Sequence, residues 1–80
     1  MLDKILEWFP EDELLTADGF DGAIIGIDTT SMRLIYSVSL CINLLEQDGM
    51  DEEEAVEYFN FNVMGSYVGD KTPIWCVDNL

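Results

Sequence analysis

The sequence predicts a small α+β domain, in which a three-stranded sheet packs against a helical hairpin and a short amphipathic helix precedes both. Three observations favour this class: apolar residues recur at helical spacing in capped stretches, three brief β-branched runs are bounded by turn residues, and 80 residues suit one domain. Hydrophobic residues make up 49% of the chain, which favours a packed core over disorder. We expect a single domain over residues 1–80, with an N-terminal helical segment at 1–16 and an α+β core at 18–78.

The N-terminal segment carries apolar residues at the spacing of one helical face, namely Leu2, Ile5, Leu6 and Phe9. Pro10 then either stops this segment or takes the first position of a further helical turn, in which the acidic residues 11–13 would oppose the positive end of the dipole. We expect this turn to run to Leu15 and to be broken at residues 17–19.

Three short runs predict the strands of the sheet. Residues 22–27 are apolar and β-branched, which indicates a buried first strand. Residues 33–36 fit either a second strand or the start of a long helix, and we favour the strand. Pro73 suits the first residue of a terminal strand over residues 74–77.

Two capped stretches predict the helical hairpin. Ser37 is the expected N-cap of a helix that ends at Gly49 and whose apolar face holds Val38, Cys41, Ile42 and Leu45. Asp51 and Glu54 form an acidic version of the capping box. The helix that follows has its apolar positions at Ala55, Val56, Phe59, Val63 and Met64.

The charge balance limits the partners. Seventeen acidic residues face only Lys4, Arg33 and Lys71, so the formal net charge is −14. Three scattered cations cannot supply phosphate contacts, and we therefore expect neither nucleic acid nor a membrane as partner. We instead expect a basic protein as the partner. Nothing in the sequence resembles a signal peptide or a spanning helix, so we expect a cytosolic setting.

The residue types also limit the chemistry. Histidine is absent, which removes the usual general base and the commonest zinc ligand. The acidic run at 48–57 lacks the residue order of a calcium loop, and residues 22–26 lack the lysine of a phosphate loop. Cys41 and Cys76 fit buried small hydrophobes better than a disulfide or a metal pair. We predict a protein that is not an enzyme, with no catalytic residue, no metal site and no cofactor.

Two sets of residues are candidates for binding. The first, for a protein partner, joins exposed acids to an aromatic pair: Asp48, Asp51, Glu52, Glu53, Glu57, Trp8 and Phe9. Each part of this set has an alternative interpretation. The acids could simply be the solvated first turn of a helix, and the aromatic pair could simply cover the sheet. The second set is a possible pocket or a structural motif: Asn62, Gly65, Tyr67, Gly69, Thr72 and Pro73.

The aromatic run at 58–61 allows two interpretations. It could stack on a ligand, but aromatic residues along a helix are more often core residues, and no basic neighbours favour nucleic acid. We expect these rings in the core and the Asn62 amide buried among them with a structural role.

Residues 18–26 (Asp-Gly-Phe-Asp-Gly-Ala-Ile-Ile-Gly) and residues 57–74, with the run Gly-Ser-Tyr-Val-Gly-Asp-Lys-Thr-Pro, resemble a family of short acidic bacteriophage proteins. The resemblance covers residues 18–77 and implies a phage-encoded protein in a bacterial cytoplasm, with a strand at 33–36. It implies no activity. Relatives usually end the second strand on Tyr-Asp, where this chain has Tyr36-Ser37, and either residue can cap the next helix.

Charge and missing catalytic groups together favour a non-enzymatic interaction protein, an inhibitor of a host nucleic-acid-binding or other basic protein. One alternative is a small-ligand or divalent-metal-binding module that uses the loop at 65–73. Another is a homo-oligomeric accessory structural protein held through the N-terminal helix. The sequence leaves the oligomeric state open.

Overall fold

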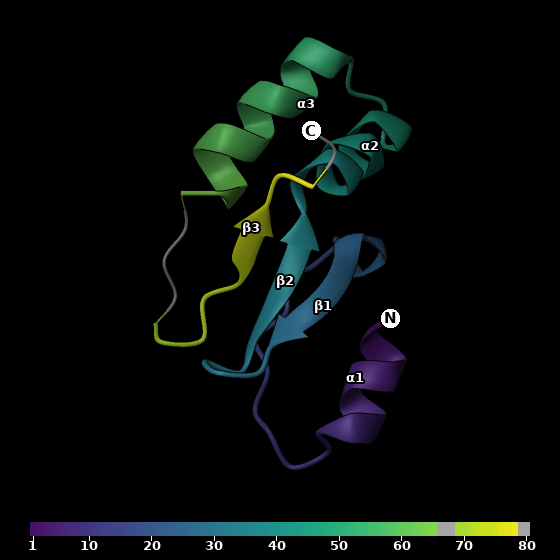
Figure 1. The fold of residues 1–80 in the computed structure, drawn as a ribbon. Coiled ribbons are helices and arrows are strands. Elements are labelled where there is room, and N and C mark those ends of the chain that lie inside the picture. Colours follow the sequence, from purple (N-terminus) through teal and green to yellow (C-terminus); the bar gives the residue numbers. More distant parts are fainter. Residues whose placement is uncertain (66–68, 79–80) are drawn as a thin grey trace.

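A three-stranded mixed sheet lies at the centre of the molecule, with its strands in the order β1-β2-β3 (Figure 1). The structure is a computed structural model and describes residues 1–65 and 69–78. β1 (Ile24–Asp28) pairs antiparallel with β2 (Arg33–Ser37), which pairs in parallel with β3 (Ile74–Cys76). The helical elements are α1 (Leu2–Trp8), a 3-10 turn (Asp21–Ala23), α2 (Val38–Gln47), α3 (Glu52–Tyr58) and a π-helix (Phe59–Val63). The predicted α+β class is confirmed.

The molecule is elongated, with principal extents of 38, 24 and 23 Å. The hairpin of α2 and α3 lies at one end, and the turn between β1 and β2 lies toward the other (Figure 1). α1 packs beside β1 at that second end. The two ends therefore present different elements to a partner.

The turn between β1 and β2 is organised by one side chain. The Asp28 carboxylate accepts hydrogen bonds from the Thr30 N–H at 3.0 Å and from the Ser31 hydroxyl at 2.9 Å. These bonds lower the pKa of Asp28 because they stabilise its charged form, and the bond from Thr30 has the largest effect. The strand predicted at 33–36 is confirmed.

The core forms around β2. Leu34 and Tyr36 alternate along the strand and are both buried on one face of the sheet. The Tyr36 ring packs against Trp75 with centroids 5.1 Å apart, and Phe59 meets Trp75 edge-on at 5.5 Å. The Tyr36 hydroxyl accepts a hydrogen bond from the Ala17 N–H at 2.7 Å, which ties the segment before β1 to the sheet. Burial raises the pKa of this phenol.

Both predicted helix caps are confirmed. Ser37 is fully buried, and its hydroxyl oxygen accepts a hydrogen bond from the Leu40 N–H at 3.2 Å. The same hydroxyl donates a hydrogen bond to the Asp78 carboxylate at 2.7 Å. The exposed Asp51 carboxylate accepts from the Glu54 N–H at 2.8 Å. One cap thus joins the sheet to the C-terminal segment, and the other satisfies only its own helix.

The apolar face of α2 is confirmed. Cys41 and Leu45 are buried, and Val38 and Ile42 pack partly buried against the same core. Burial raises the pKa of the Cys41 thiol to about 11, so this cysteine stays protonated and apolar. Gly49, with φ +109°, follows the helix in the left-handed region that glycine adopts at low cost.

Two expectations for the first third of the chain are wrong. No helical turn runs from Pro10 to Leu15, because so short a turn gains too few hydrogen bonds to offset the dihedrals that it orders. Leu14 instead packs against the core, partly buried. The first strand begins at Ile24 rather than at residue 22, since residues 21–23 form the 3-10 turn.

The helix expected after Asp51 is also not uniform. It changes from α to π at Phe59, where the Met64 N–H donates to the Phe59 carbonyl at 2.9 Å, five residues back. Of the expected apolar face, Ala55 and Phe59 are buried, whereas Val56 and Met64 are exposed. The wider π turn breaks the 3.6-residue period ahead of Met64, whereas Val56 lies in the regular part of α3.

Candidate functional site

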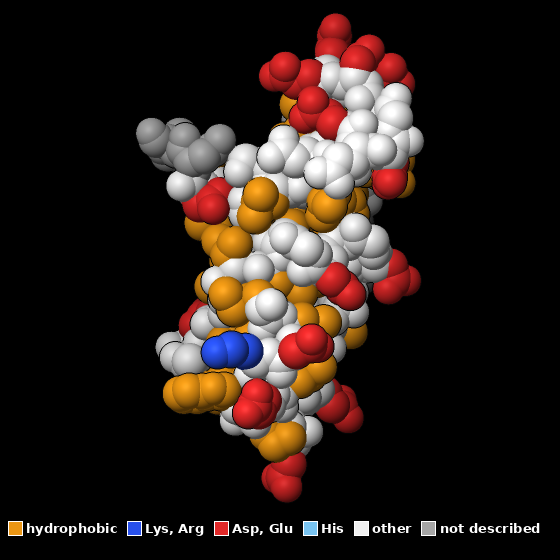
Figure 2. Space-filling model, turned by 90° about the vertical axis from the view of Figure 1, so that its right-hand side faces the viewer, with side chains coloured by type: hydrophobic (Ala, Val, Ile, Leu, Met, Phe, Trp, Pro, Cys, Tyr) orange, Lys and Arg blue, Asp and Glu red, His pale blue; other side chains and the backbone are white. Residues whose placement is uncertain are grey.

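The acids of the α2–α3 hairpin gather at one end of the molecule. We call this surface the acidic cap, and its members, all exposed, are Glu46, Asp48, Asp51, Glu52, Glu53, Glu54 and Glu57. The structure therefore brings all five predicted partner-binding acids together. Figure 2 shows a group of acidic side chains at the top of the face turned to the viewer, with further acidic side chains scattered among hydrophobic ones down to its lower end.

Helix capping explains only part of the acidic cap. Glu52, Glu53 and Glu54 occupy the first turn of α3, where carboxylates oppose the positive end of the dipole. Glu46 and Asp48 lie at the C-terminal end of α2, whereas Glu57 lies in the middle of the continuous helix that α3 and the π-helix form. Carboxylates at a helix C-terminus face the negative end of the dipole, so α2 gains nothing from Glu46 and Asp48.

Two of the three cations are held toward the opposite end of the sheet. The Arg33 Nε donates to the Thr72 carbonyl, and the Lys71 Nζ donates to the Ser31 carbonyl at 3.0 Å. Both bonds fasten the segment before β3 to the β1–β2 turn. Lys4 lies on α1, also away from the hairpin (Figure 1). The charge of the acidic cap is therefore left for solvent or a partner.

A hollow of about 330 Å³ lies on the outer side of α3. We call it the aromatic notch, and it is lined by Met50, Glu54, Glu57, Tyr58, Phe61 and Asn62. Phe61 is 83% exposed and Tyr58 42% exposed, which is unusual for rings beside a core that buries Phe59 completely. The notch is continuous with the acidic cap, because Glu54 and Glu57 belong to both.

This exposure corrects the expectation that the run at 58–61 is core. Phe59 and Val63 face inward across the π-helix, so Phe61, which lies between them, must face outward. The same geometry leaves Asn62 exposed rather than buried among the rings. Aromatic residues two positions apart cannot share one face of a helix, and that spacing was the signal available in the sequence.

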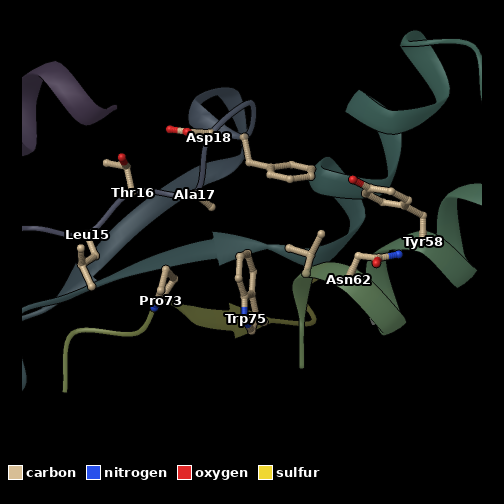
Figure 3. Close-up of a pocket in the computed structure, with 10 residues that line it drawn as sticks. Leu15, Thr16, Ala17, Asp18, Tyr58, Asn62, Pro73 and Trp75 are labelled. Carbon is tan, nitrogen blue, oxygen red and sulfur yellow. The ribbon is translucent and has the colours of Figure 1, made fainter. Parts of the chain in front are cut away.

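A separate groove of about 380 Å³ lies between the segment at 15–20, the π-helix and β3. Figure 3 shows Leu15 to Asp18 on one side, Tyr58 and Asn62 on another, and Pro73 and Trp75 below them. Among the described residues, the indole Nε1 of Trp75 is buried and lacks a hydrogen-bond acceptor. Asn62 and Pro73, both predicted for a pocket, thus do line one.

Three other members of the predicted pocket, Gly65, Gly69 and Thr72, do not line this groove. Gly65 and Thr72 line a neighbouring open hollow of about 550 Å³. Gly69 has φ +110°, and its carbonyl accepts from the Thr72 hydroxyl at 2.6 Å, which is a turn built for folding. Tyr67 lies outside the described residues. Of the described loop residues, Gly69 and Thr72 therefore form a structural turn, Pro73 lines the groove, and Gly65 and Thr72 line the second hollow.

The predicted aromatic pair does not join the acids. Trp8 is 78% exposed and Phe9 is partly buried against the core, on the helix at the far end from the hairpin (Figure 1). The interpretation that α1 covers the sheet therefore holds for Phe9 and not for Trp8. A single partner contact would need to span the length of the molecule to use both.

The described residues also limit the chemistry of these surfaces. In residues 1–65 and 69–78, no group of three or more cysteine, aspartate or glutamate side chains is arranged to hold a metal ion. Cys41 and Cys76 are both free thiols. Within the same ranges, no helix is long and apolar enough to cross a membrane. Comparison with protein-family models, with curated proteins and with solved structures finds no match to this chain.

Proposed function

We propose that this protein is a non-enzymatic interaction protein that binds a basic protein through its acidic cap. One observation carries the proposal: exposed acids gather at the α2–α3 end, where the α2 dipole disfavours Glu46 and Asp48, while Arg33 and Lys71 are bonded elsewhere. Placing like charges together lowers the stability of the free protein. A partner that supplies the missing positive charge would offset this cost.

Such binding would depend on electrostatic steering of the partner by the acidic cap. A concentrated negative field speeds the encounter with a basic surface and fixes its orientation, and the effect falls as salt screens the charges. The phage resemblance suggests a bacterial host factor as the partner. A nucleic-acid-binding protein fits best, because its basic groove is shaped for a polyanion and an acidic protein that fills it would inhibit it.

The test compares two triple variants with equal charge change. Glu46→Gln/Asp48→Asn/Glu57→Gln removes three of the seven negative charges of the acidic cap, and Glu11→Gln/Asp12→Asn/Glu13→Gln removes three exposed charges after α1. Each is used to capture proteins from bacterial lysate at low salt, and the bound species are quantified by mass spectrometry. We expect the wild type and the second variant to enrich the same basic protein, and the first variant to recover about tenfold less.

Two results would count against the proposal. Either no basic protein is enriched at low salt, or both variants lose it equally, which would show that only net charge matters. Competition by duplex DNA for the captured protein then tests the inhibitory role, since an occupant of the nucleic-acid groove must be displaced by DNA.

The groove at Trp75 supports a second candidate function, the binding of a small neutral ligand. Its volume suits a small molecule, its lining is mostly apolar with a few polar groups, and one of its lining residues, Trp75, has a buried indole N–H without an acceptor. Trp8→Phe leaves Trp75 as the single tryptophan. A fragment that binds the groove should shift Trp75 emission and raise the melting temperature, and a library that does neither would argue against this function.

A further inference from the structure

We propose that the aromatic notch is an arginine-binding element, which receives a guanidinium group from the partner of the acidic cap. The inference rests on the proposed function and names the side chain that the surface recognises. It begins from a contrast in exposure. Phe59 is fully buried, whereas Phe61, in the same π-helix, offers most of its ring to solvent.

The position of Phe61 follows from the backbone and not from a lack of room. The i to i+5 bond from Met64 to Phe59 widens the turn, and Phe59 and Val63 pack inward. Phe61 and the adjacent Tyr58 therefore form a ring surface that the core cannot cover. π-helical turns inside helices are frequent at functional sites.

The notch combines ring faces with carboxylates in one hollow. Glu54 and Glu57 line it together with Tyr58, Phe61 and the thioether of Met50. A guanidinium is planar, stacks on aromatic faces and donates paired hydrogen bonds to carboxylates, while its aliphatic stem packs on apolar groups. A lysine ammonium has the same charge but is strongly hydrated and has no flat face.

Charge decides between the possible occupants. A second copy of this chain would bring its own net charge of −14 to the notch, and a nucleic acid would bring phosphates to Glu54 and Glu57. A neutral apolar peptide would leave the two carboxylates desolvated without a partner. An arginine-rich segment matches both the rings and the acids.

The experiment uses hexa-arginine and hexa-lysine peptides, which have equal length and charge, and measures binding by calorimetry at low salt. We expect the wild type to bind the arginine peptide about threefold to tenfold more tightly than the lysine peptide. In Phe61→Leu, which keeps an apolar side chain but removes the ring, the preference should fall to about one. Phe61→Tyr should retain it.

Trp8→Leu is the matched control, because Trp8 is an equally exposed ring far from the notch. It should keep the arginine preference. If the wild type binds both peptides equally, or if Phe61→Leu retains the preference, the notch does not recognise arginine, while charge-driven binding by the acidic cap still stands. If neither peptide binds at low salt, the proposed function fails as well.

Discussion

Phe59 and Phe61 lie two positions apart in one π-helical turn, yet one is completely buried and the other is 83% exposed. Phe59 meets Trp75 at the centre of the core, and Phe61 lines the aromatic notch beside Glu57. The two residues are chemically identical. Their difference teaches that this segment divides its aromatic residues between stability and a surface, and that composition alone does not say which ring does which.

The same division holds on a larger scale. Two buried residues of β2 are tied to distant segments, since the Tyr36 hydroxyl accepts from the Ala17 N–H and the Ser37 hydroxyl donates to the Asp78 carboxylate. The exposed Asp51 carboxylate of the acidic cap instead accepts from an N–H of its own helix. Substitutions at the buried residues of β2 should destabilise the protein. Substitutions on the acidic cap should leave it folded and change what it binds.

The sharpest test of this comparison is Phe59→Ala against Phe61→Ala. Removing the buried ring should cost about 3 to 5 kcal/mol of the free energy of unfolding, because it leaves a cavity at the Trp75 contact. An 80-residue domain has only about 4 to 12 kcal/mol in total, so this variant should lose from about a quarter to all of its stability. Phe61→Ala should change stability by less than about 0.5 kcal/mol. Urea denaturation followed by circular dichroism measures both, and equal losses would erase the distinction between the two rings.

The two helix caps offer a second comparison. Ser37→Ala should cost about 2 kcal/mol, because it removes the Leu40 bond and also leaves the Asp78 carboxylate without its buried partner. Asp51→Ala, on the exposed side, should cost about 1 kcal/mol or less. The midpoints of urea denaturation rank them, and a larger loss for Asp51→Ala would contradict the assignment of stability to the buried residues of β2.

Tyr36→Phe tests the link between the first segment and the sheet. It removes the acceptor of the Ala17 N–H while keeping the ring packed, so we expect a loss of about 1 kcal/mol. Hydrogen exchange at the Ala17 amide should become faster, and exchange in α2 should change only by the global loss. Tyr58→Phe is the control on the exposed side and should leave both stability and exchange unchanged.

The smallest effect concerns pH. An unfolded Cys41 thiol ionises near its ordinary pKa of 9.0, whereas burial raises the folded value to about 11. The unfolded state therefore loses its proton first, and stability should fall as pH rises from about 9 to about 11. The raised pKa of Tyr36 acts in the same direction at slightly higher pH. Cys41→Ala should flatten the slope, and Cys76→Ala should not; an unchanged slope in both variants would assign the effect to other groups.

Much of the fold could be predicted, because its signals are local. The caps at Ser37 and Asp51, the turn at Asp28 and the strand at 33–36 each depend on residues within four positions of one another. The helix expected from Pro10 failed because a short acidic stretch has no intrinsic stability, and the packing of Leu14 decided its path instead. The candidate site was half predicted: its acids were named from charge density, but its rings were assigned to the core.

By itself, the sequence determined the α+β class, the helix starts and the acidic surface, since charge and capping are properties of neighbouring residues. Only the tertiary structure decided which aromatic ring is buried, that the Tyr36 hydroxyl holds Ala17, and that Arg33 and Lys71 are bonded away from the acidic cap. Those contacts join residues 19 to 40 positions apart. Their formation depends on how whole elements pack, and no local pattern encodes that.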